Sequence, residues 1–335
     1  MYKFNNPNKR IDWFYECYAN VKNFSIEEFI KKVNDAYYLN SAKLYSHRYT
    51  DDIYDAYSSF RDQIGHENHI NQFNIINIGA GTGFDYRMLK ELDIRFKSYY
   101  FIEPSIDMIN EYKNNINAND EKKIIIKNNH FSDLVAELKN KKNKLIFINS
   151  VLHHVIYLES FLDDIKSLME VDDILVIGHE PNNSYSRLMF LFNIAFRSIF
   201  TSALIKKIPF IKKLFKKESK NIERWNNINK QLLKENIILK EMSPLTIRRI
   251  IDYGVGHKND WKSLNIPDKY NEGFIDAGDI SSYLGKNYER IFYQTYRHLG
   301  DSNGNMIIEN LNKIFKFLFK NHGTNFVSVW KKCNL

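Results

Sequence analysis

The chain has 335 residues, 44% of them hydrophobic and 15% aromatic, a composition that is typical of a globular protein and argues against disorder. Its two cysteines, Cys17 and Cys333, lie near opposite ends of the chain, which argues against a disulfide framework and a cysteine zinc site. The net charge of +8 arises within residues 187–220, which hold nine basic residues and one acid, so the basicity is local.

Residues 1–70 are predicted to form an N-terminal helical cap. They are rich in Tyr and Phe, and Ser25 with Glu28 has the form of a capping box that opens a helix. From residue 71 onward, short apolar runs predict buried parallel strands that alternate with helices. These strands are expected at residues 73–78, 98–103, 123–127, 144–149 and 173–179.

Three glycines follow the first of these strands at a spacing of two residues. Gly79, Gly81 and Gly83 predict a sharp turn from strand to helix, where the absence of a β-carbon lets the backbone approach a ligand closely. The next strand ends at Glu103, about twenty residues on, where nucleotide-binding folds place a carboxylate that holds the ribose. This combination predicts a nucleotide-binding site.

The third glycine indicates which nucleotide is bound. A dinucleotide-binding loop has glycine at the sixth position of its motif, whereas this chain has Phe84 there and Gly83 one residue earlier. This spacing resembles the first motif of class I S-adenosylmethionine-dependent methyltransferases. Residues 103–109 resemble the second motif of that family. Residues 149–155 resemble the "VLHH" element of its small-molecule branch (methyltransferase type 11/12-like), and residues 175–182 resemble the "E-P" end of its fifth strand.

The resemblance implies an α/β fold with a Rossmann-like, mostly parallel seven-stranded sheet. The late runs at residues 289–296 and 324–330 would then be the final antiparallel pair of strands, with a helix at 305–320 between them. Residues 183–288, after strand five, are expected to be a mainly helical insertion or lid. The Rossmann-like domain would thus span residues 71–335 and carry this insertion.

The cofactor implied by the resemblance is S-adenosylmethionine. At position 77 the family usually carries an acid, whereas Asn77 keeps an acceptor oxygen but lacks the charge. Asn129 and Phe131 occupy the usual position for contacts to the adenine. The residues expected to bind the cofactor are Gly79, Ala80, Gly81, Gly83, Glu103, Pro104, Ser105, Met108, Asn129, His130, Phe131, Asn149, Ser150 and Val151.

Three histidines are candidates for chemistry because they follow the fourth and fifth strands, where open α/β sheets bind ligands. His154 is favoured as the general base, with His153 and His179 as further candidates. Glu180 is interpreted as structural. Tyr49 and His257 are expected to contact substrate, although Tyr49 also fits core packing and His257 a surface turn.

The basic segment predicts an anionic partner. Residues 188–205 are apolar but contain Arg197 and other polar residues at helical spacing, which argues against a membrane span. Residues 206–217 alternate apolar residues with pairs of lysines, a pattern typical of a helix that binds an anionic membrane surface or an acidic carrier protein. A lid that packs on its own domain is the alternative.

The function expected from these features is methyl transfer to a small, apolar or carrier-bound metabolite. RNA methylation and a non-catalytic, partner-binding copy of the fold are the alternatives. Nucleic acid is disfavoured because the fourth strand is not followed by the motif used for methylation of base amino groups, and neither cysteine lies near it. The start of the chain lacks the apolar core of a signal peptide, so we expect a cytoplasmic protein that associates with membranes if the basic segment binds them.

Overall fold

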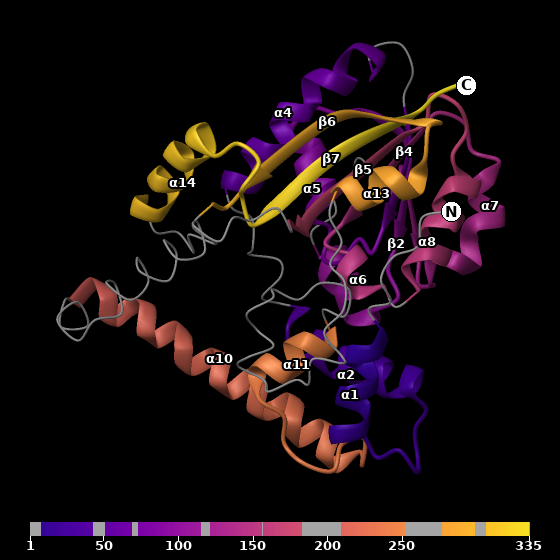
Figure 1. Cartoon of the computed structure of the whole chain (residues 1–335). Helices are drawn as coiled ribbons and strands as arrows, with labels where there is room; N and C mark the ends of the chain where they lie inside the picture. Colours follow the sequence, from indigo (N-terminus) through magenta and orange to yellow (C-terminus); the bar gives the residue numbers. More distant parts are fainter. Residues whose placement is uncertain are drawn as a thin grey trace.

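The structure is a computed structural model that describes residues 8–42, 51–68, 73–114, 121–155, 157–182, 209–251, 277–298 and 306–334. In this part of the chain, seven strands form one sheet in the order β3-β2-β1-β4-β5-β7-β6 (Figure 1). Strand β7 is antiparallel to β5 and β6, and the other strands pair in parallel. The strands are β1 (Phe73–Ile78), β2 (Phe96–Ile102), β3 (Ile124–Lys127), β4 (Lys144–Asn149), β5 (Ile174–Pro181), β6 (Tyr288–Tyr296) and β7 (Asn325–Lys332).

Every predicted strand is present, and each observed end lies within two residues of its predicted position. The antiparallel placement of β7 between β5 and β6 also confirms the seven-stranded, mostly parallel Rossmann-like sheet. The strands form because their side chains are apolar on both faces, and a parallel sheet needs this when helices cover it on both sides.

Helices cover both faces of the sheet and bury alternate strand residues. One face packs against α4 (Asp51–Asn68), α5 (Phe84–Glu91) and α6 (Ile106–Lys113). The other packs against α7 (Val135–Lys139), α8 (Leu158–Leu168) and α13 (Ala277–Leu284). Ile75 faces the first layer and Ile76 the second, as expected from the two-residue period of a strand. Helix α14 (Met306–Leu318) lies between β6 and β7 in the chain.

A separate helical bundle lies beneath the sheet in the view of Figure 1. It joins α1 (Asn8–Tyr18) and α2 (Ile26–Leu39) to α10 (Pro209–Lys234) and α11 (Pro244–Ile251) around one apolar core. Tyr37 of α2 stacks on Trp225 of α10 with a ring-centroid distance of 5.8 Å. The predicted capping box is present at the start of α2, where Glu28 N donates to Ser25 Oγ and Ser25 N to Glu28 Oε2.

The expected division into a cap of residues 1–70 and an insertion of residues 183–288 stays a prediction. Within the described residues, α4 packs on the sheet, whereas α10 and α11 pack with the two N-terminal helices. Among the described helices, none combines the length and the apolar character that crossing a bilayer would require.

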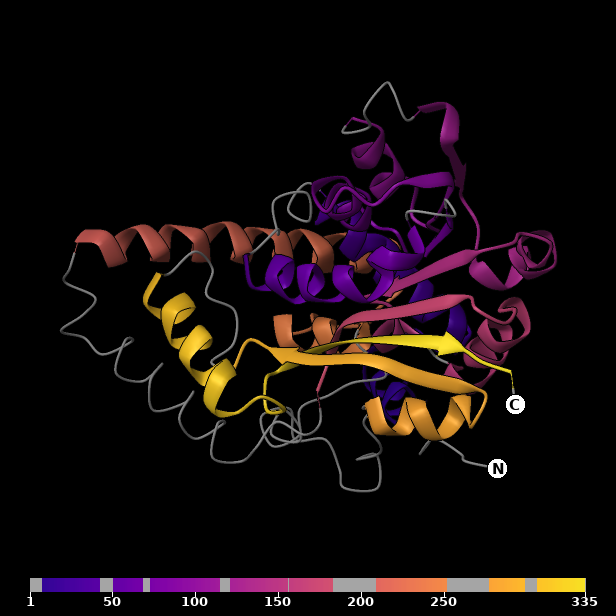
Figure 2. The same ribbon diagram turned by 90° about the horizontal axis from the view of Figure 1, so that it is seen from above.

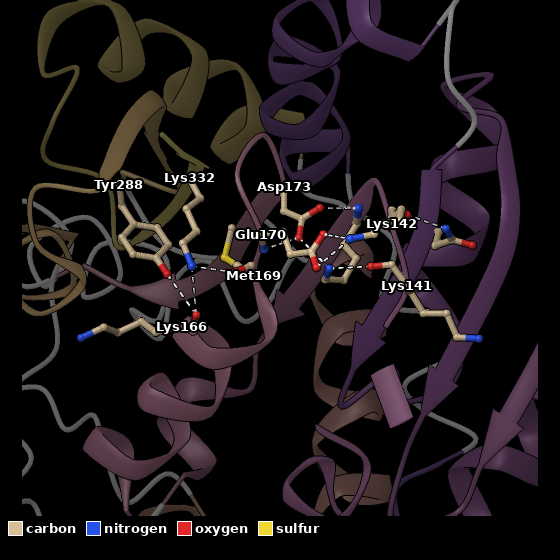
Figure 3. A network of polar contacts seen from close by, with 10 residues as sticks. Lys141, Lys142, Lys166, Met169, Glu170, Asp173, Tyr288 and Lys332 are labelled. Atoms are coloured by element: carbon tan, nitrogen blue, oxygen red, sulfur yellow. Dashed lines mark hydrogen bonds and ion pairs between the residues drawn. The ribbon is translucent and has the colours of Figure 1, made fainter. Parts of the chain in front are cut away.

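A buried ion pair fixes the amino-terminal ends of β4 and β5. Lys144 Nζ lies 2.8 Å from Asp173 Oδ2 and donates to Lys141 O, and the two charged side chains are 0% and 2% exposed. Asp173 also accepts from the backbone N–H groups of Lys144 and Glu170, as part of the network in Figure 3. These contacts hold the two strands in register, so that Asn149 pairs with Gly178 at their carboxyl ends.

Candidate active site

The carboxyl ends of β1, β2, β4 and β5 meet at one edge of the sheet. Ile78, at the end of β1, pairs with Ile102 of β2 and Ile148 of β4, and Asn149 pairs with Gly178 of β5. The loops that follow these strands therefore lie side by side. In open α/β sheets ligands bind at this edge.

The loop after β1 depends on glycine at three positions. Gly79, Gly81 and Gly83 have φ angles of +64°, +56° and +83°, a region that residues with a β-carbon rarely adopt. A β-carbon on Gly83 would collide with the ring of Tyr112, and one on Gly79 would collide with the side chain of Val151. The turn thus exposes backbone next to the start of α5, as a cradle for a ligand requires.

Glu103 connects the loop after β2 to this glycine turn. Its Oε2 accepts from Gly81 N and its Oε1 from Ser105 N, both at 2.9 Å. The side chain is buried, and burial raises the pKa of its carboxyl to about 7, although the two backbone hydrogen bonds oppose this shift. A carboxylate has about four acceptor sites, so two remain for the hydroxyl groups of a ligand.

The loop between β2 and α6 is held by side-chain caps. Ser105 accepts from Met108 N at 3.4 Å and caps α6, while Met108 is buried and Pro104 is exposed. Asn128, which sequence reasoning missed, donates from Nδ2 to the backbone oxygens of Glu103 and Pro104 at 3.0 and 2.9 Å. These bonds tie the loop after β3 to the loop after β2.

Three residues predicted to lie near the adenine follow β3. Asn129 and His130 are exposed beside the tied loops. Phe131 is only 5% exposed and packs edge-on against Phe161 of α8, with a centroid distance of 5.5 Å. Its ring therefore belongs to the core, and contact of these three residues with adenine stays a prediction.

Beneath the glycine turn lies a buried polar network. Asp85, in the first turn of α5, accepts from Asn149 Nδ2 at 2.7 Å, and Asn77 donates to Tyr99 Oη at 2.6 Å. Burial raises the pKa of Asp85 to about 7, partly offset by hydrogen bonds from Asn149 and Asn77. Among the described residues, Asn77 Oδ1 and Asn149 Oδ1 are buried acceptors without a hydrogen-bond partner. Such atoms are costly to leave unpaired, so each calls for a donor, which an ordered water or a ligand can supply.

Glu180 organises the loop after β4. Its Oε1 accepts from the backbone N–H groups of Val151 and Leu152 at 2.7 and 2.8 Å, and its Oε2 lies 2.8 Å from His153 Nδ1. Because a carboxylate only accepts, Nδ1 of His153 carries a proton, and in the neutral ring Nε2 is then the acceptor nitrogen. Glu180 is thus structural, as the sequence indicated, and also positions an imidazole, which the sequence did not reveal.

His154 connects this loop to the helical bundle. Its Nδ1 lies 2.7 Å from Ile251 O at the end of α11, and a carbonyl accepts only, so Nδ1 is the donor. The ring of Tyr38 in α2 meets it edge-on, and the ring of His153 lies 4.0 Å away between centroids. One turn thus brings both predicted histidines together.

His179 follows Gly178 in a left-handed conformation, with φ of +56°, at an irregularity in the pairing of β5 with β7. Its Nδ1 lies 2.6 Å from Tyr296 Oη, and its Nε2 lies 3.3 Å from an amino group of Arg297. Since a guanidinium only donates, Nε2 accepts and Nδ1 donates to the phenol. Both ring nitrogens are therefore engaged, and taking a proton from substrate would first require breaking the contact with Arg297.

Other predicted positions complete the edge or fall outside the described residues. Ala80 donates its backbone N–H to Ile102 O, and Ser150, with φ of +58°, donates its backbone N–H to Gly178 O. Tyr49 and His257, expected to contact substrate, lie outside the described residues. Tyr57 of α4, not foreseen from the sequence, places its hydroxyl where a β-carbon on Gly178 would lie.

A family model described as "Methyltransferase domain" matches residues 45–250, more than half of the chain. The chain belongs to this family. The match confirms that the protein is an S-adenosylmethionine-dependent methyltransferase of class I, as the sequence motifs indicated. No protein in the curated set matches the sequence.

Similar solved structures are distant. The chain is 11% identical to an S-adenosylmethionine-dependent methyltransferase from Anabaena variabilis, covering 90% of this chain and 93% of that one, with a TM-score of 0.45. It is also 11% identical to an S-adenosylmethionine-dependent methyltransferase from Mesorhizobium loti. That match covers 83% of this chain and 100% of the other, with a TM-score of 0.42. A third, putative one from Methanococcus maripaludis is 18% identical over 58% and 84% of the two chains, with a TM-score of 0.33. The family assignment rests on the sequence match and not on these structures.

The edge of this methyltransferase fits its cofactor. The glycine turn leaves room for close approach, Glu103 offers acceptors for ribose hydroxyls, and Asn149 Oδ1 offers a buried acceptor for an ammonium group. Asp85 lies in the same network, tied to Asn149, but its burial disfavours the negative charge that position 77 lacks. The individual cofactor-binding residues stay predictions that this geometry supports.

Proposed function

We propose that the methyltransferase methylates a small, apolar or carrier-bound metabolite at an atom that loses a proton, and that His153 takes up that proton. The observation that carries this proposal is the contact between His153 and the buried carboxylate of Glu180, at the strand edge where ligands bind. The contact favours His153 over His154, the residue favoured from the sequence alone.

When bound, S-adenosylmethionine supplies an activated methyl group, so the chain has only to hold the acceptor in line, exclude water and remove a proton. Glu180 keeps Nδ1 of His153 protonated, which presents Nε2 as the basic nitrogen, and its charge stabilises the imidazolium that forms when Nε2 takes the proton. His154, bonded to Ile251 O, holds the helical bundle against the same loop, and Tyr38 supplies an aromatic wall beside it.

Glu180→Gln tests the role of the carboxylate. The new amide oxygen still accepts from the backbone, but its NH2 group faces Nδ1 and favours the tautomer with the proton on Nε2. We expect methyl transfer from methyl-labelled S-adenosylmethionine into small molecules of a cell extract to fall by about 10²–10⁴-fold. Affinity for S-adenosylhomocysteine, measured by calorimetry, should hold, and ¹⁵N spectra should show the change of tautomer at His153.

Glu137→Gln, which removes an exposed carboxylate on α7, is the matched control and should retain full transfer. A wild-type protein that labels nothing and binds no S-adenosylhomocysteine would refute the function. Full transfer by Glu180→Gln would refute the role of His153. A larger loss of methyl transfer in His154→Gln than in Glu180→Gln would indicate that His154 is the base.

A further inference from the structure

Helix α14 carries an apolar face that the described structure does not cover. Ile314, Phe317 and Leu318 are 54%, 88% and 61% exposed. Their spacing of three and four residues places them on one side of the helix. Phe315 and Phe319 instead stack on each other, with centroids 5.6 Å apart, and are partly buried. A nearly fully exposed phenylalanine among other apolar residues marks an interaction surface.

Lysines border this face. Lys313, Lys316 and Lys320 lie along the same stretch, and residues 310–322 contain no acidic residue. Lys313 and Lys320 are exposed. An apolar ridge flanked by cations is the pattern of a helix that lies in the interface of an anionic bilayer.

The end of α14 is fixed to the edge of the sheet that carries the active site. Thr295, next to Tyr296 in β6, donates to Lys320 O at 2.6 Å. Asn182, two residues after Glu180, donates to Asn321 O and Gly323 O at 3.1 and 2.8 Å. These bonds place the C-terminal end of α14 near the loops that form the active site.

Helix α10 provides a second basic element on the same side of the molecule. Its 26 residues span about 39 Å at a rise of 1.5 Å per residue, and Trp225, Ile228 and Leu232 in its C-terminal part pack in the bundle. Its N-terminal half extends past the body on the side where α14 lies, in both views (Figures 1 and 2). Residues 206–217, most of which lie in that half, contain six lysines and no acid.

We propose that α14 and the N-terminal half of α10 form a surface that docks on an anionic lipid bilayer, from which an apolar acceptor reaches the active site. A second copy of the chain fits this surface poorly, because it would bring lysines against lysines. The three apolar residues are strongly exposed on one side of a helix, as insertion between lipids requires. The docking itself does not depend on which residue is the base, and only the delivery of the acceptor rests on the proposed function.

Flotation with lipid vesicles tests the proposal. We expect the wild-type protein to bind vesicles of phosphatidylcholine mixed with phosphatidylglycerol, to ignore pure phosphatidylcholine, and to be released by salt. Phe317→Ser, and separately the combined change Lys313→Gln, Lys316→Gln and Lys320→Gln, should each weaken binding by about tenfold or more. Leu239→Ser removes an apolar residue that is 69% exposed elsewhere, and should bind as wild type does.

Affinity for S-adenosylhomocysteine and the melting temperature should be unchanged in all of these variants, which separates lost docking from lost folding. A wild-type protein that stays with the soluble fraction at low salt overturns the proposal. Flotation of Phe317→Ser to the same extent as wild type would also overturn it. Equal binding of the wild-type protein to neutral and anionic vesicles would do the same. Self-association that Phe317→Ser abolishes, without vesicle binding, would assign the face to a second copy instead.

Discussion

The raised pKa of Glu103 predicts that cofactor affinity depends on pH near neutrality. Hydrogen bonds from ribose hydroxyls favour the ionised carboxylate. In the unliganded protein, burial raises the pKa of the Glu103 carboxyl to about 7. If only the ionised form binds, affinity is nearly constant above pH 7 and falls by about tenfold per pH unit below it. Binding at pH 6 should therefore be about tenfold weaker than at pH 8, whereas a carboxyl with an ordinary pKa would give no difference.

Calorimetry with S-adenosylhomocysteine at pH 6, 7 and 8, in buffers of different ionisation enthalpy, measures both the affinity and the protons released. We expect nearly one proton released at pH 6 and almost none at pH 8. Glu103→Gln should abolish the pH dependence and cost about 2 kcal/mol of binding at pH 8, because an amide has one acceptor oxygen for two backbone donors. Asp85→Asn is the control for the second carboxyl with a pKa of about 7. Equal affinity at pH 6 and pH 8 in wild type and control would refute this reasoning.

Two further predictions concern stability. Burial raises the pKa of Asp85 from 3.8 to about 7, so the folded protein favours the neutral form of this carboxyl. As pH rises from about 4 to 7, ionisation therefore favours the unfolded chain and lowers the free energy of unfolding by up to about 4 kcal/mol. Asp85→Asn should remove that loss, so its free energy of unfolding, measured with urea, should exceed that of wild type at pH 8 by more than it does at pH 5. The same difference from wild type at both pH values would refute the reasoning. Asp173→Asn should lower the free energy of unfolding by about 3–5 kcal/mol by leaving Lys144 buried without its partner charge. Lys142→Gln, at a pair whose lysine is 75% exposed, should cost less than about 1 kcal/mol, and similar losses in both variants would contradict the role of burial.

The strands of the sheet are predictable because their signal is local. Residues 73–78 and 144–149 are short runs dominated by Ile, Leu and Phe, and in a sheet covered on both faces such a run indicates a strand without reference to the rest of the chain. The glycine turn is equally local, because positive φ angles at Gly79, Gly81 and Gly83 leave few alternatives to glycine. The fold class follows from these two features, whereas the cofactor follows from the resemblance of the glycine turn and the later motifs to a methyltransferase family.

The contacts of the site are not predictable in this way, because they join residues far apart in the chain. Glu180 meets His153 only because β5 pairs with β4, and His154 meets Ile251 only because α11 packs with α2. The helical pattern of apolar residues in α10 indicates that one side of the helix packs against other elements, but it does not show which elements these are. The proposal that His153 and not His154 is the base depends on the same kind of contact, with a carboxylate 27 residues away in the chain.

The shared core of the bundle has a consequence for synthesis on the ribosome. Helices α1 and α2 end by residue 39, but the part of their shared core that α10 and α11 supply begins only at residue 209. At about 5–20 residues per second, the roughly 170 residues in between take about 10–30 seconds to emerge. For that time Phe14, Phe29 and Val33, all fully buried in the finished protein, have no native surface of α10 or α11 to cover them. The nascent chain therefore lacks this part of its core while the sheet is made, and a chain that stopped before α10 would leave these side chains without that cover.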